Sequence, residues 1–225
     1  RTNKQPDILT TGEESYQHYW PRGVALVIAP WNFPLAILCG MVTAAIVTGN
    51  AVIMKPAEPS AILGSLLMEV FQEAGVPAGV LNCLHGRGSV IGAYLVDHPD
   101  VEMIAFTGSR EVGLRIWESA GKTRPGQREL KRVVCEMGGK NAVIVDSDAD
   151  LDETIVDTIY SAFGYQGQKC SACSRLIALE ENYERVMHRL LAAAASLRVG
   201  NPEQPGITVG PVIDETAYHR IQEII

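Results

Sequence analysis

The chain has 225 residues, of which 47% are hydrophobic and 20% are charged, and its formal net charge is −7. These proportions are typical of a globular protein and exclude collagen-like and low-complexity classes. The length is sufficient for one large core or two smaller ones. Because the charge is negative, we expect neither a nucleic acid nor an anionic membrane surface as the main partner.

The sequence contains no predicted signal peptide and no predicted membrane span. Residues 1–7 are polar, and the longest apolar stretch, 36–47, is too short for a bilayer and is interrupted by Gly40 and Thr43. The five cysteines are Cys39, Cys83, Cys135, Cys170 and Cys173. An odd number of scattered cysteines favours a reducing compartment, namely the cytoplasm or, in a eukaryote, the mitochondrial matrix.

In the first part of the chain, short β-branched runs alternate with helical patterns. Strands are predicted at 24–29, 51–54, 80–84, 103–107 and 133–136, and helices at 35–48, 60–74, 90–96 and 111–120. Ser60 is the expected N-cap of the clearest helix, which Gly75 and Pro77 end. Strands separated by helices predict an α/β fold with a Rossmann-like, mostly parallel sheet and flanking helices.

A second series of elements follows Gly138 and Gly139. It comprises strands at 142–145 and 175–179 and helices at 151–163, 181–197 and 215–225. The glycine pair is the predicted hinge, because glycine tolerates unusual backbone angles. The sequence therefore predicts two domains, 1–137 and 138–225. The last helix continues to the chain end and the first residue is not Met, which favours a piece of a longer polypeptide.

Turn-forming and polar residues follow all five strands of the first series. These segments are 30–34, 55–58, 86–88, 108–109 and 136–139. Each alone is commonly a solvated turn, and the Gly86, Gly88 and Gly92 spacing departs from the usual dinucleotide fingerprint. However, ligands of parallel sheets bind at the carboxyl ends of the strands. The five segments together therefore predict a ligand site at one edge of the sheet.

Cys170 and Cys173 form a Cys-x-x-Cys pair that has three readings. A zinc site needs about four ligands, and the next histidine is the distant His188. A redox dithiol usually lies near the first strand of its fold, whereas this pair comes late. The third reading is that Cys170 is a single nucleophile whose thiolate is favoured by the neighbouring Lys169. An inert, buried role suits Cys39, Cys83 and Cys135, which lie in apolar patterns.

Five ordered blocks resemble the signature motifs of the aldehyde dehydrogenase superfamily. They are Pro30–Pro34 (PWNFP), Lys55–Glu58 (KPAE), Phe106–Ser109 (FTGS), Glu136–Lys140 (EMGGK) and Gly167–Cys170 (GQKC). The resemblance covers essentially the whole chain. The segment 164–175 and the basic stretch 122–132 are similar to the 1-pyrroline-5-carboxylate (L-glutamate γ-semialdehyde) dehydrogenases of that superfamily. The family fold would combine the Rossmann-like sheet with part of a second α/β catalytic domain.

The resemblance implies a covalent mechanism. Cys170 would attack the aldehyde carbon, and the Asn32 side chain with the Cys170 backbone N–H would hold the oxyanion. Glu136 would then activate water to hydrolyse the thioester. Phe33 and Ser171 are the expected substrate contacts, although cleft packing alone would equally explain Phe33. No metal ligand is expected.

The resemblance also implies NAD as the cofactor. The expected contacts are Ile28, Ala29, Pro30, Trp31, Lys55, Pro56, Glu58, Gly88, Gly108, Ser109, Val112, Met137 and Gly138. A carboxylate at Glu58 would accept the ribose hydroxyls and repel a 2′-phosphate. Gly108 and Ser109 would open a helix whose amides face the pyrophosphate.

Full-length members of the family are longer than this chain. By resemblance, the missing parts include the start of the cofactor domain, the loop for the substrate α-carboxylate and a strand used for oligomerisation. The parent is therefore expected to be a homo-oligomer that acts on a small aldehyde, and the isolated chain is expected to be inactive. Another semialdehyde, an aliphatic aldehyde or a non-enzymatic remnant are the alternatives.

Overall fold

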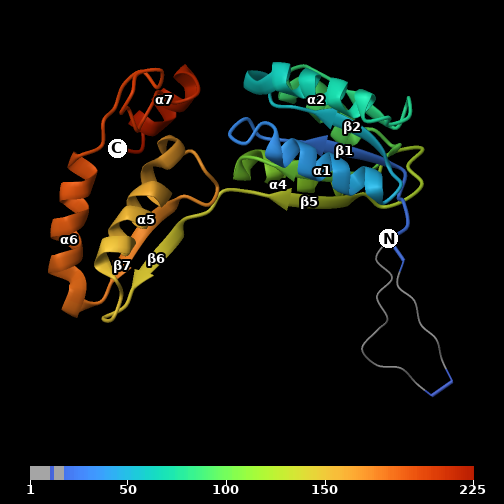
Figure 1. The fold of residues 1–225 in the computed structure, drawn as a ribbon. Coiled ribbons are helices and arrows are strands. Elements are labelled where there is room, and N and C mark those ends of the chain that lie inside the picture. Colours follow the sequence, from blue (N-terminus) through green and yellow to red (C-terminus); the bar gives the residue numbers. More distant parts are fainter. Residues whose placement is uncertain (1–10, 13–17) are drawn as a thin grey trace. The chain divides into compact units, whose positions relative to one another are not determined.

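The computed structural model describes residues 11–12 and 18–225, so the predicted polar start at 1–7 lies outside the described residues. The chain divides into two compact units, here called unit 1 (Arg1–Glu136) and unit 2 (Met137–Ile225). This division falls after residue 136, whereas the predicted boundary falls after residue 137. Figure 1 shows the ribbon of both units.

Unit 1 contains a five-stranded parallel sheet. Its strands are β1 (Val24–Ile28), β2 (Ala51–Lys55), β3 (Leu81–Cys83), β4 (Val101–Thr107) and β5 (Arg132–Glu136). They are ordered β3-β2-β1-β4-β5, and every neighbouring pair is parallel. The predicted α/β class with a parallel sheet is therefore confirmed, and all five carboxyl ends lie at one edge.

The helices of unit 1 bury the sheet. They are α1 (Ala36–Val47), α2 (Ala61–Glu73), α3 (Ala93–Asp97) and α4 (Arg110–Ala120). One core joins α1 and α2 to alternate residues of the central strands, such as Val27 of β1 and Met54 of β2, which are fully buried. Leu26 lies between Ala25 and Val27 in β1. Its side chain is also fully buried and faces the other side of the sheet. Burial on both faces explains why the strands read as continuous apolar runs.

Unit 2 is a smaller α/β unit. It contains β6 (Asn141–Val145), α5 (Leu151–Phe163), β7 (Cys173–Ala178), α6 (Glu180–Ala195) and α7 (Glu215–Gln222). β6 and β7 pair in parallel, and Figure 1 shows α5 and α6 on the same side of this pair. Val145, Leu151, Ile155 and Val186 form the core between them. The Asp150 carboxylate caps α5 by accepting hydrogen bonds from the N–H groups of Asp152 and Glu153.

Three local predictions need correction. Ser60 stands at the start of α2, but its hydroxyl donates to the Ala57 carbonyl instead of capping the helix. The helix predicted at 90–96 begins as a π-helical turn at Gly88–Gly92. α7 ends at Gln222, before the chain end. Neither Gly138 nor Gly139 has a positive φ, and the hinge expected at this pair stays a prediction.

Among the described residues, no helix is both long enough and apolar enough to cross a bilayer.

Candidate active site

The sheet of unit 1 creates a site between the ends of β1 and β4. The chain runs outward from β1 through β2 to β3, then crosses back to β4 and β5. Loops that leave β1 and β4 therefore diverge to opposite faces and leave a crevice at the carboxyl edge, where doubly wound folds bind ligands. Ile28 is the last residue of β1, and it pairs with Lys55 on one side and Phe106 on the other.

A pocket of about 600 Å³ opens near this edge. Five of the predicted cofactor residues line it, namely Ile28, Lys55, Glu58, Gly88 and Val112. The rest of the lining was not predicted. It comes from the turn at Gly88–Gly92, from α3, and from α4 with the residue Lys122 beyond it: Ser89, Gly92, Ala93, Val96, Asp97, Arg115, Ile116, Glu118, Ser119 and Lys122. Part of that lining has a signal in the sequence, because residues 112, 115, 116 and 119 share one face of a helix that starts at Ser109.

Lys55 is a buried cation at the floor of this pocket. Its side chain is 3% exposed, and its ammonium donates to the Pro56 carbonyl at 3.3 Å. Burial lowers the pKa of Lys55 from its ordinary value of 10.5, although the nearby Glu58 carboxylate opposes the shift. A desolvated lysine in a pocket is a functional-site signal, because the cost of burying it needs a compensating role.

Glu58 is tied to the turn on the opposite side of the pocket. Its Oε1 accepts a hydrogen bond from the Gly88 N–H at 2.8 Å. This bond joins the loop after β2 to the loop after β3 and fixes the carboxylate at the pocket wall. The second carboxylate oxygen lets the group accept further donors, since a carboxylate has about four acceptor positions.

The helix expected to face the pyrophosphate begins after Ser109, as predicted, and the structure adds a side-chain cap. Ser109 is the N-cap of α4, and its hydroxyl accepts from the Val112 N–H at 3.3 Å. The Gly108 N–H donates to the Glu136 carbonyl at 3.0 Å, which links the ends of β4 and β5. Gly108 and Ser109 do not line the pocket, and neither do the predicted contacts that follow β1 and β2, namely Ala29, Pro30, Trp31 and Pro56.

Asn32 and Glu136 both lie at the carboxyl edge of the sheet. Asn32 follows β1, and its Oδ1 accepts from the Phe33 N–H at 3.2 Å. Glu136 is the last residue of β5, is exposed and pairs with Thr107 of β4. An amide donor and a carboxylate base thus belong to the same edge as the pocket.

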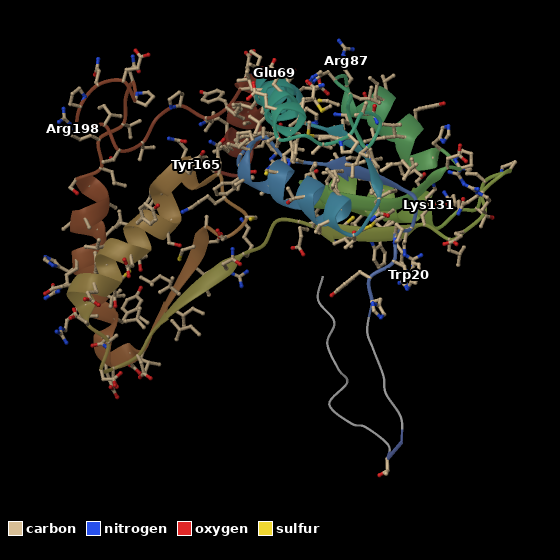
Figure 2. All side chains as sticks on the ribbon, turned by 45° about the vertical axis from the view of Figure 1, so that its right-hand side comes forward. Trp20, Glu69, Arg87, Lys131, Tyr165 and Arg198 are labelled. Atoms are coloured by element: carbon tan, nitrogen blue, oxygen red, sulfur yellow. The ribbon has the colours of Figure 1, made fainter. Side chains whose placement is uncertain are left out.

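Cys170 lies on a turn of irregular backbone between α5 and β7. Tyr165 and Gln166 have φ of 62° and 58°, and Gly167 has φ of 66°. Figure 2 shows Tyr165 near the end of α5. Left-handed conformations are uncommon for residues other than glycine and are concentrated at functional sites. The Ala172 N–H then donates to the Lys169 carbonyl at 3.2 Å, which closes a turn with Cys170 and Ser171 exposed at its tip.

The environment of Cys170 differs in part from the expectation. The Lys169 ammonium is directed toward Tyr160, 4.9 Å from the ring centroid and 3.5 Å from the carbonyl oxygen, so its expected action on the thiol stays a prediction. The Cys173 thiol donates to the Arg175 carbonyl at 3.2 Å. Among the described residues, no group of three or more His, Cys, Asp or Glu side chains could hold a metal ion.

The other three cysteines are less buried than predicted. Cys39, Cys83 and Cys135 are only partly buried, and the first two lie at the margin of the core of unit 1. Burial nevertheless raises the pKa of the Cys83 and Cys135 thiols above the ordinary value of 9.0. Their thiolate fraction at neutral pH is correspondingly small.

The predicted site residues are divided between the two units. Asn32, Phe33 and Glu136 belong to unit 1, with most of the cofactor residues, whereas Cys170, Ser171, Met137 and Gly138 belong to unit 2. The structure therefore defines the pocket and the cysteine turn separately, and their meeting at one substrate stays a prediction.

A five-stranded parallel sheet with a pocket of about 600 Å³ near its carboxyl edge is typical of the α/β proteins that bind nucleotides. The chain belongs to the aldehyde dehydrogenase family, whose model matches residues 2–225. The chain is 52% identical, over 214 residues, to 1-pyrroline-5-carboxylate dehydrogenase from Anoxybacillus flavithermus, covering 95% of this chain and 42% of that relative. The chain thus spans less than half the length of the curated relatives it matches.

Solved structures agree with this assignment. The chain is 46% identical to 1-pyrroline-5-carboxylate dehydrogenase from Thermus with bound NAD, with a TM-score of 0.90, covering 97% of this chain and 42% of that one. It is 53% identical to proline utilization A (PutA) from Bdellovibrio bacteriovorus, with a TM-score of 0.91, covering 99% of this chain and 23% of that one. The family resemblance and the expected fold are therefore confirmed.

Proposed function

We propose that the chain is part of an NAD-dependent dehydrogenase that oxidises L-glutamate γ-semialdehyde, the open form of 1-pyrroline-5-carboxylate, to L-glutamate in proline catabolism. The observation that carries the proposal is the exposed Cys170 on its shaped turn, within a chain about half identical to dehydrogenases of that name. The proposal concerns the whole polypeptide, because the chain spans 42% of those relatives.

In this proposal Cys170 is the nucleophile. Its sulfur would attack the aldehyde carbon to form a thiohemiacetal, and the Asn32 amide and the Cys170 backbone N–H would donate to the oxyanion. One preorganised donor of this kind is typically worth about 10²–10³ in kcat. Covalent capture divides one difficult oxidation into two easier steps.

Glu136 is the proposed base for the second step. After hydride loss the substrate is a thioester on Cys170, and a water molecule must be deprotonated to hydrolyse it. The Glu136 carboxylate is exposed at the end of β5, where it can accept that proton. Phe33 would contact the aliphatic part of the substrate and Ser171 its carboxylate.

The pocket of unit 1 fits NAD. Its volume of about 600 Å³ lies within the range of cofactor sites. The fixed Glu58 carboxylate would accept the adenosine ribose hydroxyls and disfavour a 2′-phosphate, and the N-terminus of α4 at Ser109 would face the pyrophosphate. Bound NAD would supply the hydride acceptor. Lys55 would donate to the ribose from its buried position, and Met137 and Gly138 complete the proposed cofactor contacts.

The proposal includes the cellular setting. Five free thiols suit a reducing compartment, which is the cytoplasm or, in a eukaryote, the mitochondrial matrix. We further propose that the whole protein is a homo-oligomer and that its main partner is a small aldehyde. The competing substrates are another semialdehyde, such as succinate semialdehyde, or an aliphatic aldehyde, with the same chemistry at Cys170.

A substrate panel tests this proposal. The chain replaces the corresponding segment of the Thermus relative, with which it shares 46% identity, and NADH formation is measured at 340 nm. We expect glutamate γ-semialdehyde to give the highest kcat/KM and NAD to exceed NADP. Equal turnover of succinate semialdehyde or hexanal would overturn the substrate, and no turnover of any aldehyde would overturn the enzymatic role. The same assay on the isolated chain tests whether it is inactive alone.

A further inference from the structure

One side chain from a neighbouring strand holds the turn that carries Cys170. Asn141, the first residue of β6, donates from Nδ2 to the Cys170 carbonyl at 2.7 Å and to the Ala172 carbonyl at 3.2 Å. A primary amide has two N–H donors, so a single Asn can satisfy both oxygens at once. Ser161 of α5 adds a bond from the other direction, because its hydroxyl accepts from the Cys173 N–H at 3.2 Å.

The strand pairing is irregular at the same place. Asn141 is paired with Cys173, but Ala142 is paired with Arg175, so Ser174 is an extra residue on β7. A bulge of this kind redirects the chain and is common beside active sites. The Asn141 amide therefore binds the carbonyls of Cys170 and Ala172, which precede the ladder and pair with no residue of β6.

Gly139 leaves room for this amide. A Cβ atom at Gly139 would lie 3.3 Å from Asn141 Oδ1, which is closer than most real Cβ contacts. The second glycine of the Gly138-Gly139 pair thus has a packing reason that does not depend on a hinge.

We propose that Asn141 is a positioning residue for Cys170, which holds the carbonyl oxygens of Cys170 and Ala172 and so fixes the direction of the thiol and of the Cys170 N–H. This inference depends on the proposed function only in calling Cys170 the nucleophile. The physical reason is local. A carbonyl oxygen that accepts a hydrogen bond from Asn141 is held away from the sulfur. Without that bond the partly negative oxygen is free to turn toward the sulfur and to disfavour the thiolate.

Alkylation of Cys170 tests the inference in the full chain without any turnover. The rate of iodoacetamide addition to Cys170 and Cys173 is followed by peptide mass spectrometry from pH 6 to 10 in Asn141→Leu and Asn141→Asp. Both side chains are close to Asn in size, and neither can donate at these pH values. We expect the Cys170 rate at pH 7 to fall about tenfold, the equivalent of one lost hydrogen bond. We also expect the half-maximal pH to rise and the Ala172 amide to exchange faster. Because Cys170 is already exposed, loosening the turn cannot raise its rate by uncovering it.

Asn82→Asp is the matched control, because Asn82 is also exposed and its amide also donates to a backbone carbonyl, that of Gly79. It should leave the Cys170 profile unchanged. If Asn141→Leu fails to fold, Asn141→Asp decides, and if neither folds the role is structural and the inference is overturned. A Cys170 profile unchanged in folded variants also overturns it, as does equal acceleration of Cys170 and Cys173. A native chain that reacts as expected here but forms no adduct with aldehydes would instead contradict the proposed function.

Discussion

The turns at the strand ends of unit 1 and the cysteine turn of unit 2 are built by different means. In unit 1, parallel strands place Lys55 and Glu136 at one edge, with Gly108 directly after β4, because the register aligns the strand ends. In unit 2, Cys170 is presented by left-handed backbone and by hydrogen bonds from side chains. The comparison teaches that strand register can place a whole set of cofactor residues. A single exposed nucleophile instead needs dedicated side-chain support.

The largest effect on activity is expected at Glu136, the strand-end residue that we propose as the base in thioester hydrolysis. In the Thermus chimera, Glu136→Gln should lower kcat by about 10²–10⁴, because an amide cannot take a proton from water. The acylated enzyme should accumulate, which mass spectrometry detects as a thioester on Cys170. A variant with normal turnover would place the base elsewhere and remove Glu136 from the site.

Packing behind the strand-end turns gives the next effect. A Cβ atom at Gly64 of α2 would lie 2.5 Å from Pro56 Cγ, in the turn between Lys55 and Glu58. Gly64→Ala should lower the free energy of unfolding by about 1–3 kcal/mol through overpacking. Gly40→Ala in α1 is the control, because no atom lies within 4 Å of its added Cβ. It should stabilise by up to about 1 kcal/mol through helix propensity, and urea unfolding measures both variants.

If Gly40→Ala destabilised the chain as much as Gly64→Ala, the close approach at Pro56 would not be the cause.

A smaller and more local effect is expected in the cysteine turn. Ser161→Ala removes the acceptor of the Cys173 N–H, which should cost about 0.5–1.5 kcal/mol. Hydrogen exchange of the Cys173 amide should accelerate, whereas Ser174→Ala, at the exposed neighbouring position, should leave it unchanged. Equal acceleration in both variants would show that β7 frays as a whole and that the side-chain support is unimportant.

The smallest effect concerns pH and Lys55. Burial lowers the pKa of Lys55 below 10.5, so between the lowered value and 10.5 the unfolded chain binds more protons than the folded one. The contribution of Lys55 to stability therefore rises with pH across that window. Urea unfolding from pH 7 to 10 should show a shallower rise in Lys55→Met than in the native chain, whereas Lys140→Met, at an exposed lysine, should retain the native slope. Identical slopes in all three would contradict the burial argument.

Sequence patterns predict one region better than the other for physical reasons. The helix Leu151–Phe163 was predicted to the residue, because a helical apolar pattern begins directly after a capping Asp150. Strand ends were predictable because β-branched runs end at glycine, proline or charge. Nothing in local propensity indicates left-handed angles at Tyr165 and Gln166, or the reach of Asn141 across to Cys170. The Asn141 contact joins residues 29 apart in sequence, which local patterns do not reveal. The Cys-x-x-Cys pair therefore left three readings of Cys170 open, and the motif resemblance selected one of them.

The Asn141 interaction also shows what the resemblance did not provide. The motif that includes Gly138 and Gly139 was interpreted as a hinge, because glycine pairs often are. Gly139 does not have a positive φ, and a Cβ atom there would meet the Asn141 side chain. Close approach is thus a second reason for glycine at this position, and the hinge stays a prediction.

The most direct test of the account is the site of covalent capture. The Thermus chimera that carries the unsubstituted chain is incubated with glutamate γ-semialdehyde and NAD, quenched with acid and digested for mass spectrometry. We predict an acyl adduct on Cys170 that is strongly enhanced in Glu136→Gln and absent in Cys170→Ala. An adduct on Cys173, or one that persists in Cys170→Ala, would contradict the assignment of Cys170 as the nucleophile.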